Sequence, residues 1–295
     1  MDHRGCATFI TIVIVATGTY CGGRSPAAAA LATVVFPQPG GDVRVELTRD
    51  YLVAVRGKVG DRSGLTFVVD TGTWPTLVDA RLARQFRKAG TTEPVDSFTR
   101  TDELERAVLT SLAVGSFSTV DVPVLVTDLA RLEPHFGIKA DVVLGVEVLR
   151  GACFSIDYAR RTLSFVCRDD WRATLPLDRR SSLPVANVTI DGTPLRLSVD
   201  TGSPAVMVYD AAIPDGWRSR VHSEINAFDF YGPLRLRRFI ADVIAVRPVT
   251  WLGRPVHILP AGVIRQSEHG VLGVRALGVS AVQFDLERMI LSWND

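Results

Sequence analysis

The feature that most constrains the fold of this chain is a pattern that occurs in both of its halves. An apolar run ends in the tripeptide Asp-Thr-Gly at Asp70 and again at Asp200, 130 positions later. A second apolar segment ends in Leu-Gly at Gly145 and at Gly273, 128 positions apart. A third pair of related segments covers residues 154–165 and 282–293, again 128 positions apart. Three landmarks at nearly constant spacing predict two related halves that arose by duplication.

The segments around these landmarks are typical of strands. They are short runs rich in Val, Leu, Ile and Thr, separated by turn residues, and they predict strands at 43–47, 51–59, 65–69, 107–113, 120–126, 185–190, 195–199, 235–246 and 256–259. Asp191-Gly192 lies between two of these runs and predicts a two-residue hairpin turn. One helix is expected at 79–88, which is rich in Ala, Leu and Arg and is followed by Gly90. The predicted class is all-β, with lobes at 43–170 and 180–295 joined by the polar stretch 168–184.

Composition and charge exclude several classes of partner. The 295 residues are 47% hydrophobic and 22% charged, which is typical of a globular chain with room for two cores. A net charge of +1 gives no reason to expect nucleic acid or an anionic membrane surface as a partner. The five histidines are dispersed and none lies at metal-ligand spacing from a cysteine, so no metal site is expected.

Asp-Thr-Gly directly after an apolar strand is the pattern that carries chemical information. At average residue frequencies this tripeptide arises by chance about once in 4,000 positions, so a single copy would be weak support. Here two copies occur, each after a predicted strand and each followed by a hydroxyl residue, Thr73 or Ser203. Two related loops therefore present one carboxylate each, at Asp70 and Asp200.

In these features the chain resembles the pepsin and retropepsin group of aspartic peptidases, and its later strands resemble bacterial retropepsin-like domains fused in tandem. The resemblance covers residues 43–293. It implies a bilobal aspartic-peptidase fold made of two retropepsin-like β-barrel lobes, which form an internal pseudo-dimer within a monomer. In that group each lobe supplies one Asp-Thr-Gly loop, and a segment ending in Leu-Gly, here at Gly145 and Gly273, packs beside it. The implied function is an aspartic endopeptidase that binds peptides in extended form and needs no cofactor beyond a catalytic water.

The chemistry expected of Asp70 and Asp200 follows from placing two carboxyl groups in one site. Like charges a few ångströms apart do not both ionise easily, so the pair shares a proton, as is established for aspartic proteases in general. The ionised group can take a proton from a water held between them, and the protonated group can polarise the scissile carbonyl. Both carboxyl groups must then lie within hydrogen-bonding reach of one water. Gly72 and Gly202 permit the tight loop that brings backbone amides to the carboxylates.

The remaining loop residues have roles that the resemblance implies. Thr71 and Thr201 would form hydrogen bonds across the lobe boundary and hold the two loops together. Thr73 and Ser203 would donate hydroxyl hydrogen bonds to the outer oxygens of the carboxylates.

Substrate cover is where the chain departs from the expected pattern. In the resembling group a β-hairpin flap closes over the substrate, and the candidate aromatic residues are Phe98 in the first half and Phe230 or Tyr231 in the second. The sequence leaves open which hairpin closes. Trp74 stands where the group usually has a smaller residue, and it either shapes a substrate pocket or crowds the cleft.

Two other functions are compatible with the same fold. One is a catalytically silent peptide-binding protein, and the other is a structural or interaction protein of the cell envelope. Because both Asp-Thr-Gly triplets are intact, the sequence favours the peptidase over either alternative.

The first 32 residues have the pattern of a signal peptide. Arg4 precedes an apolar run at 7–16, which is shorter than the roughly 20 residues that a membrane-spanning helix needs. Small residues follow at 27–32 and are typical of a cleavage region. The protein is therefore expected to be periplasmic or extracellular, with no membrane span in the mature chain. Cys21 raises the option of a lipoprotein anchor, but Tyr20 disfavours it because lipoprotein signals have a small residue there.

Two cysteines lie outside this leader, and their spacing suggests that they face each other. Cys153 and Cys167 are symmetric about Arg160 in a predicted hairpin, as are Ile156 and Ser164. In an oxidising compartment this arrangement permits a disulfide. Two buried free thiols fit the sequence equally well.

Overall fold

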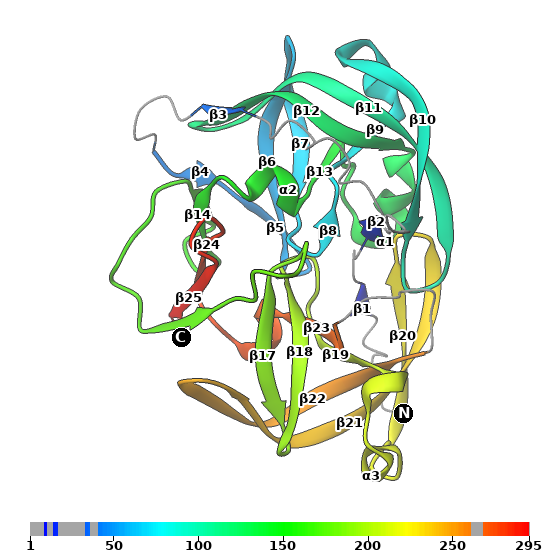
Figure 1. The fold of residues 1–295 in the computed structure, drawn as a ribbon, viewed down its shortest axis with the longest axis vertical. Coiled ribbons are helices and arrows are strands. Elements are labelled where there is room, and N and C mark those ends of the chain that lie inside the picture. The colour runs from blue at the N-terminus through cyan, green and yellow to red at the C-terminus, as the bar shows by residue number, and fades with distance from the viewer. Residues whose placement is uncertain (1–8, 11–13, 17–32, 36–40, 261–267, 295) are drawn as a thin grey trace, which may run out of the picture.

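The chain folds into three β-sheets, one made mainly by each half and one shared between the halves (Figure 1). The computed structural model describes residues 9–10, 14–16, 33–35, 41–260 and 268–294. The all-β class predicted from the sequence is confirmed.

The helices and strands have the following bounds. The first-half sheet contains β2 (Ile14–Ala16), β3 (Thr33–Val35), β5 (Glu46–Thr48), β6 (Leu52–Val59), β7 (Arg62–Val69), β8 (Thr73–Trp74), β9 (Leu77–Asp79), β10 (Phe86–Asp96), β11 (Thr101–Val114), β12 (Phe117–Thr127) and β13 (Val142–Leu144). The second-half sheet contains β1 (Phe9–Ile10), β17 (Val185–Ile190), β18 (Thr193–Asp200), β19 (Val206–Tyr209), β20 (Ser223–Asp229), β21 (Gly232–Val246), β22 (Val249–Leu259) and β23 (Gly270–Gly273). The shared sheet contains β4 (Val43–Arg44), β14 (Cys153–Asp157), β15 (Thr162–Ser164), β16 (Ala173–Pro176), β24 (Ala281–Asp285) and β25 (Ile290–Asn294). Short helices connect them: η1 (Ala80–Gln85), η2 (Leu129–Leu132), α1 (Glu133–Phe136), α2 (Val146–Leu149), η3 (Asp210–Ala212), α3 (Asp215–Arg218) and η4 (Val274–Leu277).

The pairing of the strands follows the same order in both halves. In the first half β13 lies parallel to β7 and antiparallel to β9, and β9 lies parallel to β12. In the second half β23 lies parallel to β18 and antiparallel to β19, and β19 lies parallel to β22. The strands that precede the two Asp-Thr-Gly triplets therefore occupy equivalent interior places in their sheets.

The strand β7 explains why the first triplet is held firmly. Its last five residues are all buried rather than alternating between buried and exposed. A strand covered on both faces shows such a continuous apolar run, because neither face meets water. Here β7 lies between β6 and β13. The strand therefore delivers Asp70 from the interior of a sheet and not from an edge.

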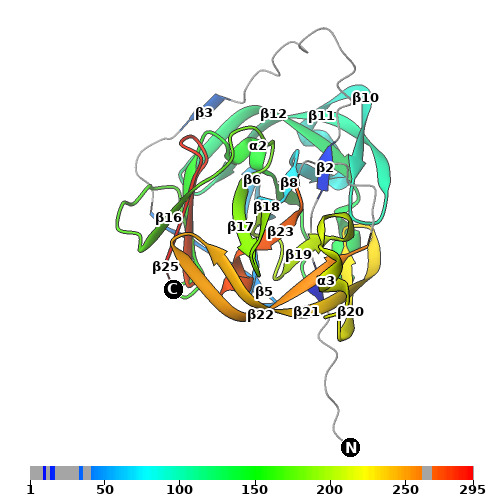
Figure 2. The same cartoon turned by 60° about the horizontal axis from the view of Figure 1, so that its bottom comes forward.

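The shared sheet joins the two halves directly. Strand β14 of the first half pairs antiparallel with β24 of the second, with Phe154 opposite Phe284. Their rings stack at a centroid distance of 5.2 Å and both are fully buried. Figure 2 shows β25 alongside β16, which comes from the stretch predicted as a simple connection. Within this connection Ala173–Pro176 form a strand, in which buried Ala173 and Leu175 alternate with exposed residues.

Two local predictions have different outcomes. The helix expected at 79–88 is wrong beyond residue 85, because strand β10 begins at Phe86. The short helix η1 begins after Asp79, whose carboxylate accepts a hydrogen bond from Arg81 N at 2.8 Å. Buried Phe86 pairs with Leu109 of β11, so cross-strand packing overrides the helical composition. The hairpin turn at Asp191-Gly192 is present as expected, with both φ angles positive at 46° and 83°.

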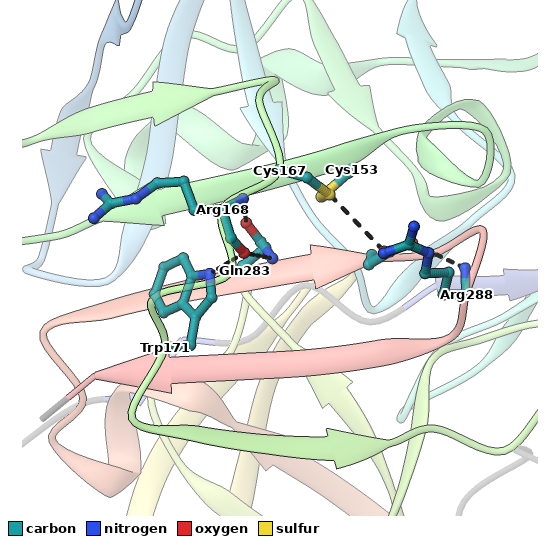
Figure 3. The surroundings of a disulfide bond; sticks show 7 residues. Cys153, Cys167, Arg168, Trp171, Gln283 and Arg288 are labelled. Atoms are coloured by element: carbon teal, nitrogen blue, oxygen red, sulfur yellow. Dashed lines mark hydrogen bonds and ion pairs between the residues drawn. A yellow bond between two sulfur atoms is a disulfide. The ribbon is translucent and has the colours of Figure 1, made fainter.

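A disulfide joins Cys153 and Cys167, with their Cα atoms 5.5 Å apart (Figure 3). The symmetry used to predict their proximity is off by one position, because Ile156 pairs with Leu163 and not with Ser164. Cys167 lies beyond the end of β15 and reaches Cys153 from the following loop. Among the described residues, the cysteines and Asp285 lie close enough to hold an ion, but both sulfur atoms are in the disulfide.

The loop after the disulfide is anchored to the second half. The side-chain amide of Gln283 accepts a hydrogen bond from Arg168 N at 2.8 Å and donates one to Arg168 O at 3.0 Å (Figure 3). The indole N–H of Trp171 donates to the same carbonyl at 2.9 Å. These bonds fix the start of the connection between the halves onto β24.

Replacing both Cys153 and Cys167 by serine is expected to lower the free energy of unfolding by about 3 kcal/mol, the value for a loop of about 15 residues. The reason is that the unfolded chain gains freedom while the strand contacts of β14 remain. Chemical denaturation of the double variant beside the parent protein, both without reductant, measures the difference. A parent that responds to reductant no more than the double variant would contradict the bond.

Most of the predicted signal peptide lies outside the described residues, as do Cys6 and Cys21. Within the predicted signal peptide the structure places two short strands. Strand β1 pairs with β20, and strand β2 pairs with β8 and β10. None of the helices in the described part of the chain has the length and apolar character needed to span a membrane.

Candidate active site

The two aspartates of the triplets lie side by side at the centre of the molecule. Asp70 follows β7 and Asp200 ends β18, and both are fully buried. Asp70 N donates to Leu144 O at 3.1 Å, so the Leu-Gly segment after β13 fixes the first aspartate. In the second half Asp200 pairs with Gly273 of β23. Each predicted Leu-Gly segment therefore packs beside its predicted aspartate.

The threonines of the triplets bind the two loops to each other. Thr71 Oγ1 donates to Val199 O at 2.8 Å and accepts from Thr201 N at 3.1 Å. In the symmetric arrangement, Thr201 Oγ1 donates to Val69 O at 3.0 Å and accepts from Thr71 N at 3.1 Å. Four buried hydrogen bonds thus cross between the halves beside Asp70 and Asp200, as the resemblance implied for the two threonines. The pair of aspartates is called the dyad below.

The glycines of the triplets each face the opposite aspartate. Gly72 N donates to Asp70 Oδ1 at 2.8 Å, and Gly202 N donates to Asp200 Oδ1 at 2.6 Å. A Cβ on Gly72 would lie 2.5 Å from Asp200 Cγ, and one on Gly202 would lie 2.7 Å from Asp70 Oδ2. These distances show that each carboxyl group sits against the other half's glycine, where no larger residue fits.

The outer oxygens of the two carboxyl groups have different surroundings. Thr73 Oγ1 donates to Asp70 Oδ2 at 2.9 Å, as expected. The matching expectation for Ser203 is not met at Asp200 Oδ2, which has no hydrogen-bond partner among the groups that the structure describes. Ser203 Oγ lies instead 3.3 Å from both Ala205 O and Ala205 N. Its loop turns the hydroxyl toward its own backbone, and the dyad is therefore asymmetric.

This asymmetry separates the acidities of the two groups. Burial raises the pKa of Asp70 to about 6, while hydrogen bonds from Thr73, Asp200 and Gly72 oppose the increase. Burial, together with the charge of Asp70, raises the pKa of Asp200 well above its ordinary value. The Thr73 bond to Asp70, which has no counterpart at Asp200 Oδ2 among the described groups, favours the ionised form at Asp70 within a pair that titrates as a unit.

Two long hairpins, β10–β11 and β20–β21, one from each half, meet at their tips (Figure 1). Thr99 Oγ1 donates to Asp229 Oδ2 at 2.7 Å, and these residues are 130 positions apart, as are Thr71 and Thr201. The guanidinium of Arg100 lies 4.3 Å from the ring centroid of Tyr231. The two hairpins are therefore joined to each other at their tips, and which of them closes over a substrate stays a prediction.

Each hairpin also places an aromatic residue on the opposite half. Phe98 is buried and lies 6.3 Å from the ring of Tyr209 in the second half. Phe228, 130 positions later, stacks on His135 of the first half at 4.3 Å. Of the predicted flap residues, Phe230 is buried in a cluster of first-half residues, and Tyr231 is half-buried beside it. These contacts hold each hairpin against the opposite half.

The short strand β2 lies between the first hairpin and the loop of the first Asp-Thr-Gly triplet. It pairs parallel with β8, with Ile14 opposite Thr73, and antiparallel with β10, with Ala16 opposite Val95. This place therefore accommodates an extended backbone segment that pairs with β8 on one edge and with β10 on the other.

Trp74 neither fills the space between the carboxyl groups nor stands free. It packs against the main hydrophobic core, and the guanidinium of Arg150 lies 4.6 Å above its ring. Arg150 also donates to Ser181 O at 3.1 Å and Ser182 O at 2.9 Å, at the start of the second half. Trp74 thus supports the loop of the first Asp-Thr-Gly triplet.

Sequence reasoning missed two polar residues near the site, Glu147 and Asp229. Glu147 accepts a hydrogen bond from Thr76 N at 2.5 Å, just after the first triplet. The sequence feature that could have identified Glu147 is its position two residues after Leu-Gly, where the second half has Arg275. Asp229 is fully buried and accepts bonds from Tyr231 N and Thr99 Oγ1, a role that no local pattern indicates.

The comparison with known families decides what this arrangement belongs to. Residues 55–148 match a family model described as an aspartyl protease. These residues form a retropepsin-like aspartyl protease domain. The matched part of the chain contains Asp70, the first hairpin and the Leu-Gly segment at Gly145, while Asp200 lies outside it. No curated protein sequence matches the chain.

Proposed function

We propose that the protein is an aspartic endopeptidase that hydrolyses peptide bonds with a water activated between Asp70 and Asp200. One observation carries the proposal: two buried carboxyl groups face each other on interlocked loops, each against the other half's glycine. A silent binding protein would not need two costly buried carboxyl groups of unequal acidity. The match to the aspartyl protease family supports the same reaction class.

The unequal acidities give each carboxyl group a starting role. Asp70 begins ionised, stabilised by the bonds from Gly72 N and Thr73 Oγ1, and accepts a proton from the attacking water. Asp200 begins protonated and donates a hydrogen bond to the scissile carbonyl oxygen as negative charge develops there. The tetrahedral intermediate then breaks down when a carboxyl group protonates the leaving amine. The two apparent pKa values belong to the pair as a unit, because the groups are coupled.

The substrate is proposed to bind as an extended strand beneath the two hairpins. The pairing of β2 with both the catalytic loop and the first hairpin supports this, because it shows backbone hydrogen-bonding groups available on both sides. Because Asp70 and Asp200 are fully buried and the hairpin tips are bonded to each other, we expect the tips to part when a substrate enters.

Cleavage of a mixed peptide library between pH 3 and 9 tests the proposal, using the chain from residue 33 onward. Activity is expected to rise as Asp70 ionises, through a pH of about 6, and to fall again when Asp200 loses its proton at higher pH. Products should arise from internal bonds, and in H₂¹⁸O each new carboxyl terminus should carry one ¹⁸O, because water supplies one of its two oxygens. Folded protein that cleaves nothing across this range would favour the peptide-binding alternative.

We also propose that the protein is exported. The leader pattern of residues 1–32 and the disulfide between Cys153 and Cys167 support an oxidising compartment. Fractionation of cells that express the full chain should find it outside the cytoplasm and shortened at its N-terminus. Full-length protein in the cytoplasm would contradict export.

A further inference from the structure

Glu147 holds the loop that follows the first Asp-Thr-Gly triplet. It lies in the single-turn helix α2, directly after the Leu-Gly segment. Its Oε1 accepts from Thr76 N at 2.5 Å, and Gly145 N donates to Thr76 Oγ1 at 2.8 Å. Thr76 is fully buried, so both its backbone and its side chain are fixed by the segment that also fixes Asp70.

The carboxyl group of Glu147 is buried against this segment. Its Oε2 has no hydrogen-bond partner among the described residues, and a Cβ on Gly145 would lie 2.7 Å from that oxygen. Burial raises the pKa of Glu147 to about 7. The charged group beside it is Arg150, whose guanidinium covers Trp74. Burying a carboxyl group costs free energy, because the group loses its contact with water. The presence of one at this place therefore indicates a structural purpose.

A short path connects Thr76 to the reacting carboxylate. Only Trp74 and Pro75 separate Thr76 from Thr73, whose hydroxyl donates to Asp70 Oδ2 at 2.9 Å. That bond is the strongest influence that lowers the pKa of Asp70 against the effect of burial. If Thr76 moves, the Thr73 hydroxyl loses its position. The other ionisable groups that face Asp70 are Asp200 and Tyr51, and burial raises the pKa of the Tyr51 phenol, which keeps it neutral.

The second half lacks this arrangement. Arg275 occupies the position equivalent to Glu147, and Val206 the position equivalent to Thr76. Arg275 points elsewhere and donates to Asp50 O at 3.1 Å and Val279 O at 2.7 Å. In the same half, Asp200 Oδ2 has no partner among the described groups. The carboxyl group that holds the loop and the hydroxyl that donates to the aspartate thus occur together in the first half. Among the described residues, both are missing at the corresponding atoms of the second half.

We propose that Glu147 is a positioning residue that, by holding Thr76, keeps the hydroxyl of Thr73 on Asp70 Oδ2 and so makes the surroundings of the two aspartates unequal. The inference rests on the proposed function, because it concerns the acidity of the same pair. It adds the cause of the asymmetry: a single Glu on one half and Arg on the other assign different roles to two otherwise equivalent aspartates.

The test compares Glu147→Ala, which removes the acceptor, with Glu147→Gln, which keeps an acceptor oxygen of the same reach. In Glu147→Ala the acidic limb of kcat/KM against pH should move upward by about one pH unit, the effect of losing one hydrogen bond to a charged group. At a pH one unit below the parent's limb this lowers kcat about tenfold with little change in KM. Glu147→Gln should remain within about threefold of the parent, since the bond to Thr76 N persists. Arg275→Ala is the matched control at the equivalent position and should leave the acidic limb in place.

A direct measurement separates this inference from the proposed function. The pKa of Asp70 can be followed by ¹³C NMR of its carboxyl group in the parent and in Glu147→Ala, without any turnover. A higher pKa in the variant supports the inference even if no peptide is cleaved. An unchanged Asp70 pKa in folded Glu147→Ala overturns it even if the protein is an active peptidase. If Glu147→Ala does not fold, Glu147→Asp, whose shorter side chain falls short of Thr76 N, takes its place in the same measurement.

Discussion

Replacing either Asp70 or Asp200 by asparagine is expected to reduce kcat/KM for peptide cleavage by about 10⁴-fold or more, which is the range for losing a member of a catalytic unit. In Asp70→Asn the side-chain amide would keep an oxygen for Gly72 N but could not take a proton from water. In Asp200→Asn the amide would likewise keep an oxygen for Gly202 N but would not supply the acidic proton. The losses should not add in the double variant, because either change alone removes the acid–base pair.

The stability of these variants provides the control. Each carboxyl group is fully buried, and burial opposes its ionisation, so a neutral amide of the same shape should not destabilise the fold. Thermal unfolding at pH 7 is therefore expected to give a Tm equal to or above that of the parent. Cleavage that persists at the parental rate in either folded variant would exclude the dyad as the catalytic centre.

Gly72→Ala is expected to lower kcat/KM by about 10²-fold or more, because the added methyl group would collide with the carboxyl group of Asp200. Its Cβ would lie 2.5 Å from Asp200 Cγ, closer than any real contact, and Asp200 is held by Gly202 N and by its place in β18. Either the first loop or the second carboxyl group must move. The variant should also lose about 1–3 kcal/mol of stability, as overpacked interiors do.

Gly216→Ala is the matched control for this prediction. Gly216 lies in α3, and a Cβ built there has nothing within 4 Å. Its activity should equal that of the parent, and its stability should be unchanged or slightly higher because alanine favours helix. The comparison is made by steady-state kinetics and urea denaturation of the two variants together. Full activity in Gly72→Ala would show that the loops are not packed as closely as the structure has them.

The sequence predicted the parts of the site that depend on short, repeated patterns. Asp70 and Asp200 were located because each ends an apolar strand and is followed by the same two residues. The crossed bonds of Thr71 and Thr201 were expected from the resemblance, and the structure has all four. Patterns of this kind act locally, so their geometry follows from a few consecutive residues.

The parts that could not be predicted depend on contacts between distant segments. The Ser203 hydroxyl occurs in the same pattern as Thr73, yet Asp200 Oδ2 has no partner among the described groups, because the following residues differ and turn the loop backbone toward it. The bond between Thr99 and Asp229 joins two hairpin tips whose strands were predicted only in part. The one-residue difference in the register of β14 and β15 has the same origin, since pairing with β24 and not symmetry about the turn sets it.

The shared sheet has a consequence for how the site is assembled. Because β14 of the first half pairs with β24 of the second, and the crossed threonines lie on the same chain, the two carboxyl groups come together in a first-order event. A site made from two separate chains would come apart on dilution and would require two identical halves. Here the specific activity should stay constant down to nanomolar protein, and each half is free to accept substitutions that the other could not share.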